Sequence, residues 1–404
     1  MNLVPLSIDS IHFGQPLPFV LRGADGTLLA QKGFVIRNRD DLNVLLARGV
    51  QLHVDTDESG ESHRAYLAGL QRMLIADTNL GEIASMKISA AEPTERNRVD
   101  TGPADWPALQ ERATQLLRSP SAGDFGSRFQ ALHEELVRHS THSPDATVLA
   151  LIYLSAQETR LYSATHAMLV SCVCMVAARE VLAWPEAKVL TLGRAALSMN
   201  VAMTELQDQL VQQALPLTAA QITAVESHAS RSEILLRQLG VADPVWLEAV
   251  RCHHHRMPGP MEQKKEALQI ARLIQRADIF GARLAPRTAR SPMPVTAAMQ
   301  ACYYDEEQKV DPAGAALVKA LGIYPPGAFV RLATQEIAIV LRRGPSATTL
   351  RVAVVMNRLG MPTGELIPRN TAQPSCKITG PVAHKDVRVQ FQVSRLVAMS
   401  EKMV

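Results

Sequence analysis

Four histidines and one aspartate in separate segments of this chain are of the residue types that bind metal ions, and they follow one another in an order that suits a buried metal site. The sequence contains 12 histidines. Four of them and one aspartate follow one another through a strongly helical stretch: His166, His228, His253, His254 and Asp278. Imidazoles and a carboxylate from different helices can bind one metal ion, because each helix brings one or two ligands to a common point. These five residues are therefore candidate metal ligands.

Each candidate ligand also has an explanation that needs no metal. His166 stands in an apolar stretch, where a histidine is often a hydrogen-bonded core residue. His253 and His254 come shortly before Met257-Pro258, near an expected helix C-terminus, where imidazoles can meet free carbonyl groups. Asp278 lies in an apolar helical segment, so its carboxylate needs a partner. Spacing alone leaves both explanations open.

The elements that would position these residues are predicted to be helices. From about 106 to 320, apolar residues recur at intervals of three and four, as in Phe129, Leu132 and Leu136. Prolines separate the helical segments, because a helix interior tolerates proline poorly; they stand at 144, 185, 216, 244, 258 and 286. The pattern predicts an all-α domain over 106–325.

Two β-rich parts are predicted to flank the helical domain. In residues 1–60, Ala24-Asp25-Gly26 is a turn signal that joins two short strands into a hairpin. Residues 61–105 are expected to form a helix and a linker. Residues 326–404 are expected to form a second small β-rich module, which includes an alternating run at 387–393. The predicted fold class is thus mainly α, with small β-rich N- and C-terminal modules.

Composition argues against nucleic-acid binding. The 404 residues carry 42 basic and 39 acidic side chains, a net charge of +3, and only 4% of them are aromatic. Such a balance gives no field that attracts phosphate backbones, and few rings are available to stack on bases. We therefore expect no nucleic acid among the partners.

Cysteines and apolar runs point to a cytoplasmic protein. The five cysteines show no spacing of a disulfide framework or a zinc ribbon. Cys172 and Cys174 stand two apart in an expected helix, on opposite faces, and are interpreted as core thiols. No signal peptide pattern is visible, and the most apolar run, Ala164–Ala178, is too short to span a bilayer. We expect no membrane span.

Several segments follow one another in an order typical of one enzyme family. They are Tyr162-Ser-Ala-Thr-His166, Ala195-Ala-Leu197, Val225-Glu-Ser-His228, Ala242–Val250, His253-His-His-Arg256, Ile270–Asp278 and Tyr324-Pro-Pro-Gly327. In order and approximate spacing, the stretch from about 150 to 330 resembles an HD-GYP domain. That domain is the branch of the HD phosphohydrolases that hydrolyses the bacterial second messenger cyclic di-GMP. The resemblance implies an HD-type all-α fold and a site for two metal ions.

The chain departs from the family at both motifs that give it its name. Met199 and Asn200 stand where the family has its His-Asp pair, and Met203 stands where it has a lysine. After Arg256, the residues Met257–Pro260 replace the Gly-Tyr-Pro motif in a shorter loop. Loss of the bridging aspartate removes one ligand from each metal ion and the negative charge between the two ions.

The resemblance divides the surviving ligands between two metal positions. One position keeps His166 and Asp278, and the other keeps His228, His253 and His254. Two ligands are too few for firm binding, whereas three imidazoles can hold one zinc, iron or manganese ion. The alternative is a site without metal, in which the histidines bond to Asn200 or Asp278.

Three functions are compatible with this pattern. The favoured one is a degenerate, non-catalytic HD-GYP-like module in bacterial signalling, with cyclic di-GMP or a signalling protein as candidate partner, because ligand, bridge and lysine are lost together. The second is a metal-dependent cyclic di-GMP phosphodiesterase with a reduced metal site, in which Arg256 meets a phosphate. The third is a structural scaffold for protein interactions. A homodimer through a helical face would be an ordinary outcome in each case.

Overall fold

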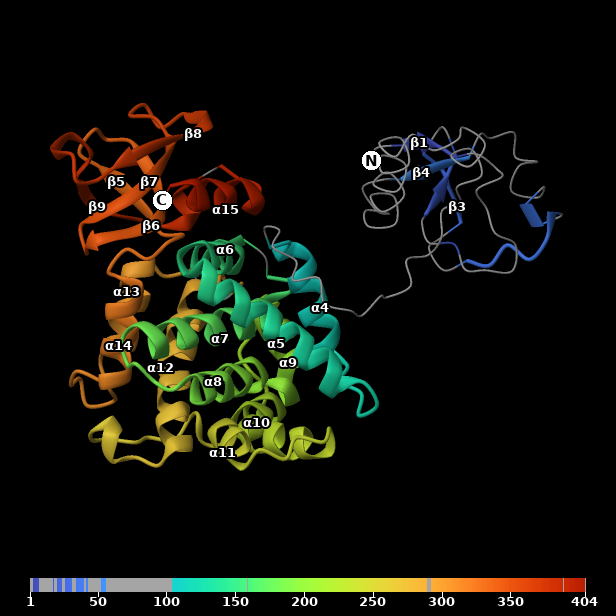
Figure 1. Cartoon of the computed structure of the whole chain (residues 1–404), viewed down its shortest axis with the longest axis horizontal. Helices are drawn as coiled ribbons and strands as arrows, with labels where there is room; N and C mark the ends of the chain where they lie inside the picture. Colours follow the sequence, from blue (N-terminus) through green and yellow to red (C-terminus); the bar gives the residue numbers. More distant parts are fainter. Residues whose placement is uncertain are drawn as a thin grey trace, which may run out of the picture. The chain divides into compact units, whose positions relative to one another are not determined.

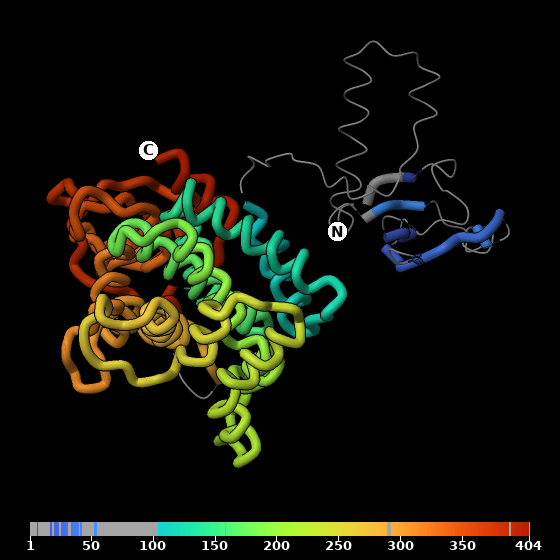
Figure 2. Tube along the Cα trace, turned by 60° about the horizontal axis from the view of Figure 1, so that its bottom comes forward, coloured from blue at the N-terminus to red at the C-terminus, as the bar shows by residue number. Residues whose placement is uncertain are grey.

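The computed structural model of the chain divides into two compact units, Met1–Thr101 and Gly102–Val404 (Figures 1 and 2). In the second unit it describes residues 104–403 except 158, 289–291 and 388. In the first it describes residues 3–6, 17, 20–23, 26–30, 34–39, 41–42 and 52–55. Almost all of the helix and linker predicted for residues 61–105 lies outside the described residues.

A small antiparallel sheet forms the described part of the first unit. Its strands are β1 (Leu3–Pro5), β2 (Leu21–Arg22), β3 (Leu28–Ala30) and β4 (His53–Asp55), in the order β1-β4-β2-β3. Strands β2 and β3 pair with Leu21 opposite Ala30. Gly26, between them, has a φ of 83°, a conformation that glycine adopts without strain. The predicted β-rich module and its hairpin are confirmed.

Among the described residues, eleven α-helices lie between Trp106 and Leu321, which confirms the predicted all-α character of this part of the chain. They are α4 (Trp106–Arg118), α5 (Phe125–His142), α6 (Pro144–Gln157), α7 (Tyr162–Glu180), α8 (Glu186–Ser198), α9 (Thr204–Gln212), α10 (Ala219–Gln238), α11 (Pro244–Cys252), α12 (Glu266–Leu284), α13 (Val295–Tyr303) and α14 (Pro312–Leu321). The prolines named above stand at helix starts or between helices, as Pro144 and Pro244 illustrate.

Helix α7 is the central element of the helical domain. It is apolar on every side, and its residues from Tyr162 to Ala178 are buried. It packs against α4, α5, α6, α8, α9, α12 and α14 (Figure 1). Cys172 and Cys174 are fully buried free thiols in this helix, as predicted, and burial raises the pKa of Cys172 to about 12.

A second antiparallel sheet follows the helices and shares their hydrophobic core. Its strands are β5 (Phe329–Leu332), β6 (Ile337–Ser346), β7 (Thr349–Met356), β8 (Pro362–Asn370) and β9 (Ile378–Val382), in the order β8-β7-β6-β5-β9. The predicted β-rich C-terminal part is therefore confirmed. Arg343 of β6 forms ion pairs with Asp145 of α6 and Glu180 of α7, which fasten the sheet to the bundle.

The alternating run at 387–393 is not a strand, contrary to the sequence prediction. Its last residue begins helix α15 (Val393–Lys402), which packs on α6 and β6. Val387, Val389 and Phe391 pack on the shared core, and the backbone N–H of Phe391 donates to the hydroxyl of Tyr153. The run is apolar at alternate positions because these side chains pack on the core. The backbone of Phe391 is hydrogen-bonded to a side-chain hydroxyl and not to a neighbouring strand.

In the part of the chain that the structure describes, no helix has both the length and the apolar character needed to cross a membrane.

The buried imidazole of His133 should make the fold sensitive to acid. His133 lies in α5 and is 1% exposed; burial, with smaller contributions from Arg194 and Arg179, lowers its pKa from 6.5 to about 4. Between pH 6.5 and about pH 4, the His133 imidazole is therefore protonated in the unfolded chain but neutral in the folded chain. The free energy of unfolding falls across this window, by at most about 1.4 kcal/mol per pH unit from this residue.

A His133→Leu variant should lose less stability than the wild-type protein when the pH is lowered from 7.5 to 5 in urea unfolding experiments. His142→Leu is the matched control, because His142 lies exposed in the same helix. Equal pH dependence of the wild-type protein and His133→Leu would contradict the assignment.

Candidate metal centre

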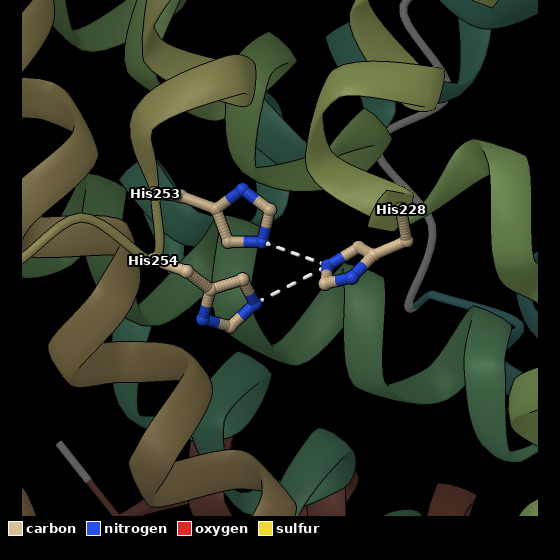
Figure 3. Close-up of side chains that lie close together, drawn as sticks. All are labelled: His228, His253 and His254. Carbon is tan, nitrogen blue, oxygen red and sulfur yellow. Dashed lines mark hydrogen bonds between the residues drawn. The ribbon is translucent and has the colours of Figure 1, made fainter. Parts of the chain in front are cut away.

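Three histidines from two neighbouring helices converge on one point (Figure 3). His228 belongs to α10, His253 directly follows α11, and His254 is the next residue. The Nε2 atom of His228 lies 3.3 Å from Nε2 of His253 and 3.2 Å from Nε2 of His254. One nitrogen from each ring lies within 4.8 Å of the other two. Three imidazoles at such separations can be ligands of one ion.

Backbone carbonyl groups fix the orientation of two of these rings. The Nδ1 atom of His253 lies 2.6 Å from the carbonyl oxygen of Val250, and Nδ1 of His228 contacts the carbonyl oxygen of Val225. Because a carbonyl oxygen only accepts hydrogen bonds, both Nδ1 atoms must carry hydrogen. Both Nε2 atoms are then unprotonated in the neutral rings, and their lone pairs face one another.

This arrangement suits a cation. The unprotonated Nε2 atoms of His228 and His253, 3.3 Å apart, cannot form a hydrogen bond with each other, because neither carries hydrogen. Nε2 of His254 can donate a hydrogen bond to His228. A carbonyl group that holds Nδ1–H and directs Nε2 inward is the usual outer support of a metal-bound histidine. The three-histidine cluster therefore fits a divalent transition metal by its donor atoms and by their orientation.

Burial keeps the inner histidines of this cluster neutral. Burial first, and the charge of His254 second, lower the pKa of His253 to about 3 despite the opposing effect of Asp278. Burial is also the main reason why the pKa of His228 is lowered. Neutral imidazoles are the form that binds a metal ion.

His166 and Asp278 form a separate pair. Nε2 of His166, in α7, lies 2.7 Å from a carboxylate oxygen of Asp278, in α12. Burial by itself would raise the pKa of Asp278, but the hydrogen bond and charge of His166, with the charges of His254 and His253, hold it well below its ordinary value. Asp278 is thus ionised and Nε2 of His166 donates to it. The carboxylate has the partner that the sequence required.

Gly281 makes room for the imidazole of His166. A Cβ atom built at this position would lie 3.0 Å from Nδ1 of His166, closer than ordinary van der Waals contact. The same nitrogen is buried and has no hydrogen-bond partner among the described residues. Sequence reasoning missed Gly281; its position three residues after Asp278, on the same helical face, was the available signal.

The structure thus gathers the five candidate ligands into a cluster of three and a pair of two. The two groups are electrostatically coupled: the negative charge of Asp278 partly opposes the lowering of the pKa values of His228 and His253. No hydrogen bond joins Asp278 to the cluster within the described residues.

The residues at the altered motifs lie at the end of α8 and beyond α11. Met199 is fully buried in the hydrophobic core, and Met203 is 8% exposed. Asn200 is half-buried, and its side-chain oxygen has no hydrogen-bond partner among the described residues. Arg256 is exposed, and its guanidinium forms no ion pair within the described part of the chain. After it, Lys264 closes the short loop by donating to the carbonyl oxygens of residues 258–260.

Comparison with known proteins assigns the helical domain to a family. Residues 152–314 match the model of the HD domain. Cyclic di-GMP phosphodiesterase PA4108 of Pseudomonas aeruginosa is 26% identical over 249 residues, which cover 60% of this chain and 57% of that protein. The matched region thus spans little more than half of the relative. Bd1817, an HDG"Y"P protein from Bdellovibrio bacteriovorus, matches 79% of this chain and 99% of its own with a TM-score of 0.45 and 14% identity.

Proposed function

Since the chain belongs to the HD-GYP proteins, we propose that it is a degenerate member of that family, a non-catalytic regulatory module of cyclic di-GMP-type signalling. Phosphodiester hydrolysis in a two-metal site needs anionic ligands that bridge the ions. The neutral amide of Asn200 stands where the resemblance expects the bridging aspartate. This substitution is the observation that carries the proposal.

The geometry of the remaining ligands supports the same conclusion. His166 and Asp278 are hydrogen-bonded to each other, and the three-histidine cluster contains no carboxylate within the described residues. A second ion would have neither a free pair of ligands nor a bridging charge. The direct test is hydrolysis of cyclic di-GMP by the purified protein with Mn(II), Fe(II) or Zn(II), where the expected rate is that of a protein-free control.

The three-histidine cluster is proposed to hold one divalent transition metal ion. His228, His253 and His254 would be its ligands, and the carbonyl groups of Val225 and Val250 would orient the first two. An ion held by three imidazoles can acidify a bound water molecule. In a regulatory module, the same ion would fix α10 to the end of α11 and so stabilise this part of the fold.

Titration with Co(II) should give one bound ion per chain, with the visible absorption of a four-coordinate site. His253→Ala should abolish this absorption, because two imidazoles are too few ligands. His166→Asn is the informative control: it should leave the absorption unchanged, since His166 pairs with Asp278. Two bound ions per chain, or absorption that survives His253→Ala, would contradict the assignment of the ligands.

The second candidate function is a one-metal cyclic di-GMP phosphodiesterase. It is favoured by the preserved histidine cluster and by the guanidinium of Arg256, which has no ion-pair partner among the described residues. Hydrolysis by the unmodified protein would select this candidate. Cyclic di-GMP as a ligand, a signalling protein as a partner, a homodimer and a cytoplasmic location all stay predictions.

A further inference from the structure

A pocket of about 380 Å³ opens between α5, α8 and the start of α11, and the histidine cluster contributes nothing to it. Three aromatic side chains form part of its wall: Phe125, Phe129 and Trp246. The rings of the first two are tilted against each other with centroids 5.1 Å apart, and those of the last two are stacked with centroids 5.2 Å apart. Trp246 is the most accessible of the three, at 8% exposed. The volume lies within the range of small-molecule sites.

One arginine in this wall lacks a partner. Arg194 of α8 is half-buried, and its Nε atom is buried without a hydrogen bond. Throughout the described residues, no carboxylate lies within ion-pair distance of its guanidinium. His133, which is electrostatically coupled to Arg194, has a pKa lowered to about 4 and supplies no counter-charge. A guanidinium partly removed from water without a counter-charge is costly unless a ligand supplies one.

The only acidic side chain among the residues that line the pocket is already in use. Asp243 is the N-cap of α11, and its carboxylate accepts hydrogen bonds from the backbone N–H groups of Val245 and Trp246, at 2.9 and 3.2 Å. The indole N–H of Trp246 is also satisfied, by the hydroxyl of Ser198 at 2.8 Å. The aromatic wall is therefore fixed in place, and Arg194 is the charged lining residue left for a ligand.

We propose that this pocket binds a small organic anion with an apolar body, its anionic group on Arg194 and its apolar part against the accessible edge of Trp246. Arginine binds carboxylate, sulfonate and phosphate groups through a pair of hydrogen bonds, and the apolar part of the pocket wall favours an apolar ligand body. The proposal does not depend on the metal centre or on hydrolysis, since none of the lining residues is a candidate metal ligand.

Calorimetric titration with naphthalene-2-sulfonate and its neutral analogue naphthalene-2-methanol tests the proposal on the full chain. The sulfonate should bind with one site per chain and at least about tenfold more tightly than the alcohol, the effect expected of a hydrogen bond to a charged group. Arg194→Met should remove this preference and leave the affinity for the alcohol unchanged. Arg331→Met is the matched control, since Arg331 lies exposed on β5.

Gly126 provides a second test that does not threaten the fold. It lines the pocket in the first turn of α5, and a Cβ atom built there meets no heavy atom within 4 Å. Both Gly126→Ala and Gly126→Leu should fold, because either residue favours a helix over glycine. The alanine variant should bind both probes as the wild-type protein does, and the leucine variant should bind both at least about tenfold more weakly, by filling the pocket.

Three results would overturn the proposal: no binding of either probe to the wild-type protein, equal affinities for the two probes, or unchanged sulfonate binding in Arg194→Met or Gly126→Leu. The first would show that the pocket is not a site for such molecules. The second would remove Arg194 as an anion-binding group. The third would place the bound probe elsewhere on the molecule.

Discussion

Purified protein incubated with cyclic di-GMP and Mn(II), Fe(II) or Zn(II) under anaerobic conditions is expected to form no product above the protein-free control. Cleavage of the phosphodiester needs a nucleophile at neutral pH and positive charge for the phosphate oxygens. Two bridged metal ions supply both. Here Asn200 offers no bridging charge, Met203 offers no ammonium group, and Asp278 is held by His166.

A Met199→His/Asn200→Asp double variant is the informative comparison. It restores the pair of residues that the resemblance expects after α8, while the histidine cluster stays as it is. Metal-dependent hydrolysis by the double variant alone would support the degenerate interpretation. Hydrolysis by the unmodified protein, lost in His253→Ala, would instead show a working phosphodiesterase with a reduced metal site.

The sequence predicted which candidate ligands lie close together better than it predicted the hydrogen bonds between them. The order of the histidines on separate helices identified the residues that converge, and the need of Asp278 for a partner was evident from its apolar surroundings. The identity of that partner was not, because His166 is 112 residues away and spacing within one helix says nothing about which helices pack together. The carbonyl groups that orient His228 and His253 are invisible in a sequence, since every residue carries one.

The fold was predictable where the spacing of apolar residues is compatible with only one type of secondary structure. Apolar residues at intervals of three and four, interrupted by prolines, gave the helical domain, and glycine in a turn gave the first hairpin. The run at 387–393 was misread because alternation also arises in a segment that crosses a core without a neighbouring strand. Strand β8 (Pro362–Asn370) was not predicted, because all of its residues are exposed or half-buried and it carries prolines at 362 and 368.

Removal of the buried guanidinium of Arg272 is expected to destabilise the helical domain by about 3–5 kcal/mol, the usual cost of breaking a buried ion pair by removing one partner. Arg272 lies in α12 and is 2% exposed. It forms ion pairs with Asp311 at 2.6 Å and with Glu306 at 3.1 Å. Asp311 is 4% exposed and caps α14 by accepting the N–H of Gly314. In Arg272→Met, Asp311 would stay buried with Arg276 as its nearest cation, at 3.8 Å.

Urea unfolding of Arg272→Met beside two further variants tests this explanation. Lys309→Met is the control: it removes an ion pair with Glu307 whose side chains are 74% and 61% exposed, so its effect should be small beside that of Arg272→Met. Arg272→Met/Asp311→Asn should be more stable than Arg272→Met, because the amide still caps α14 and no longer carries a charge. If the double variant is instead the less stable of the two, the cost lies in lost packing of the arginine side chain, and not in the unpaired carboxylate.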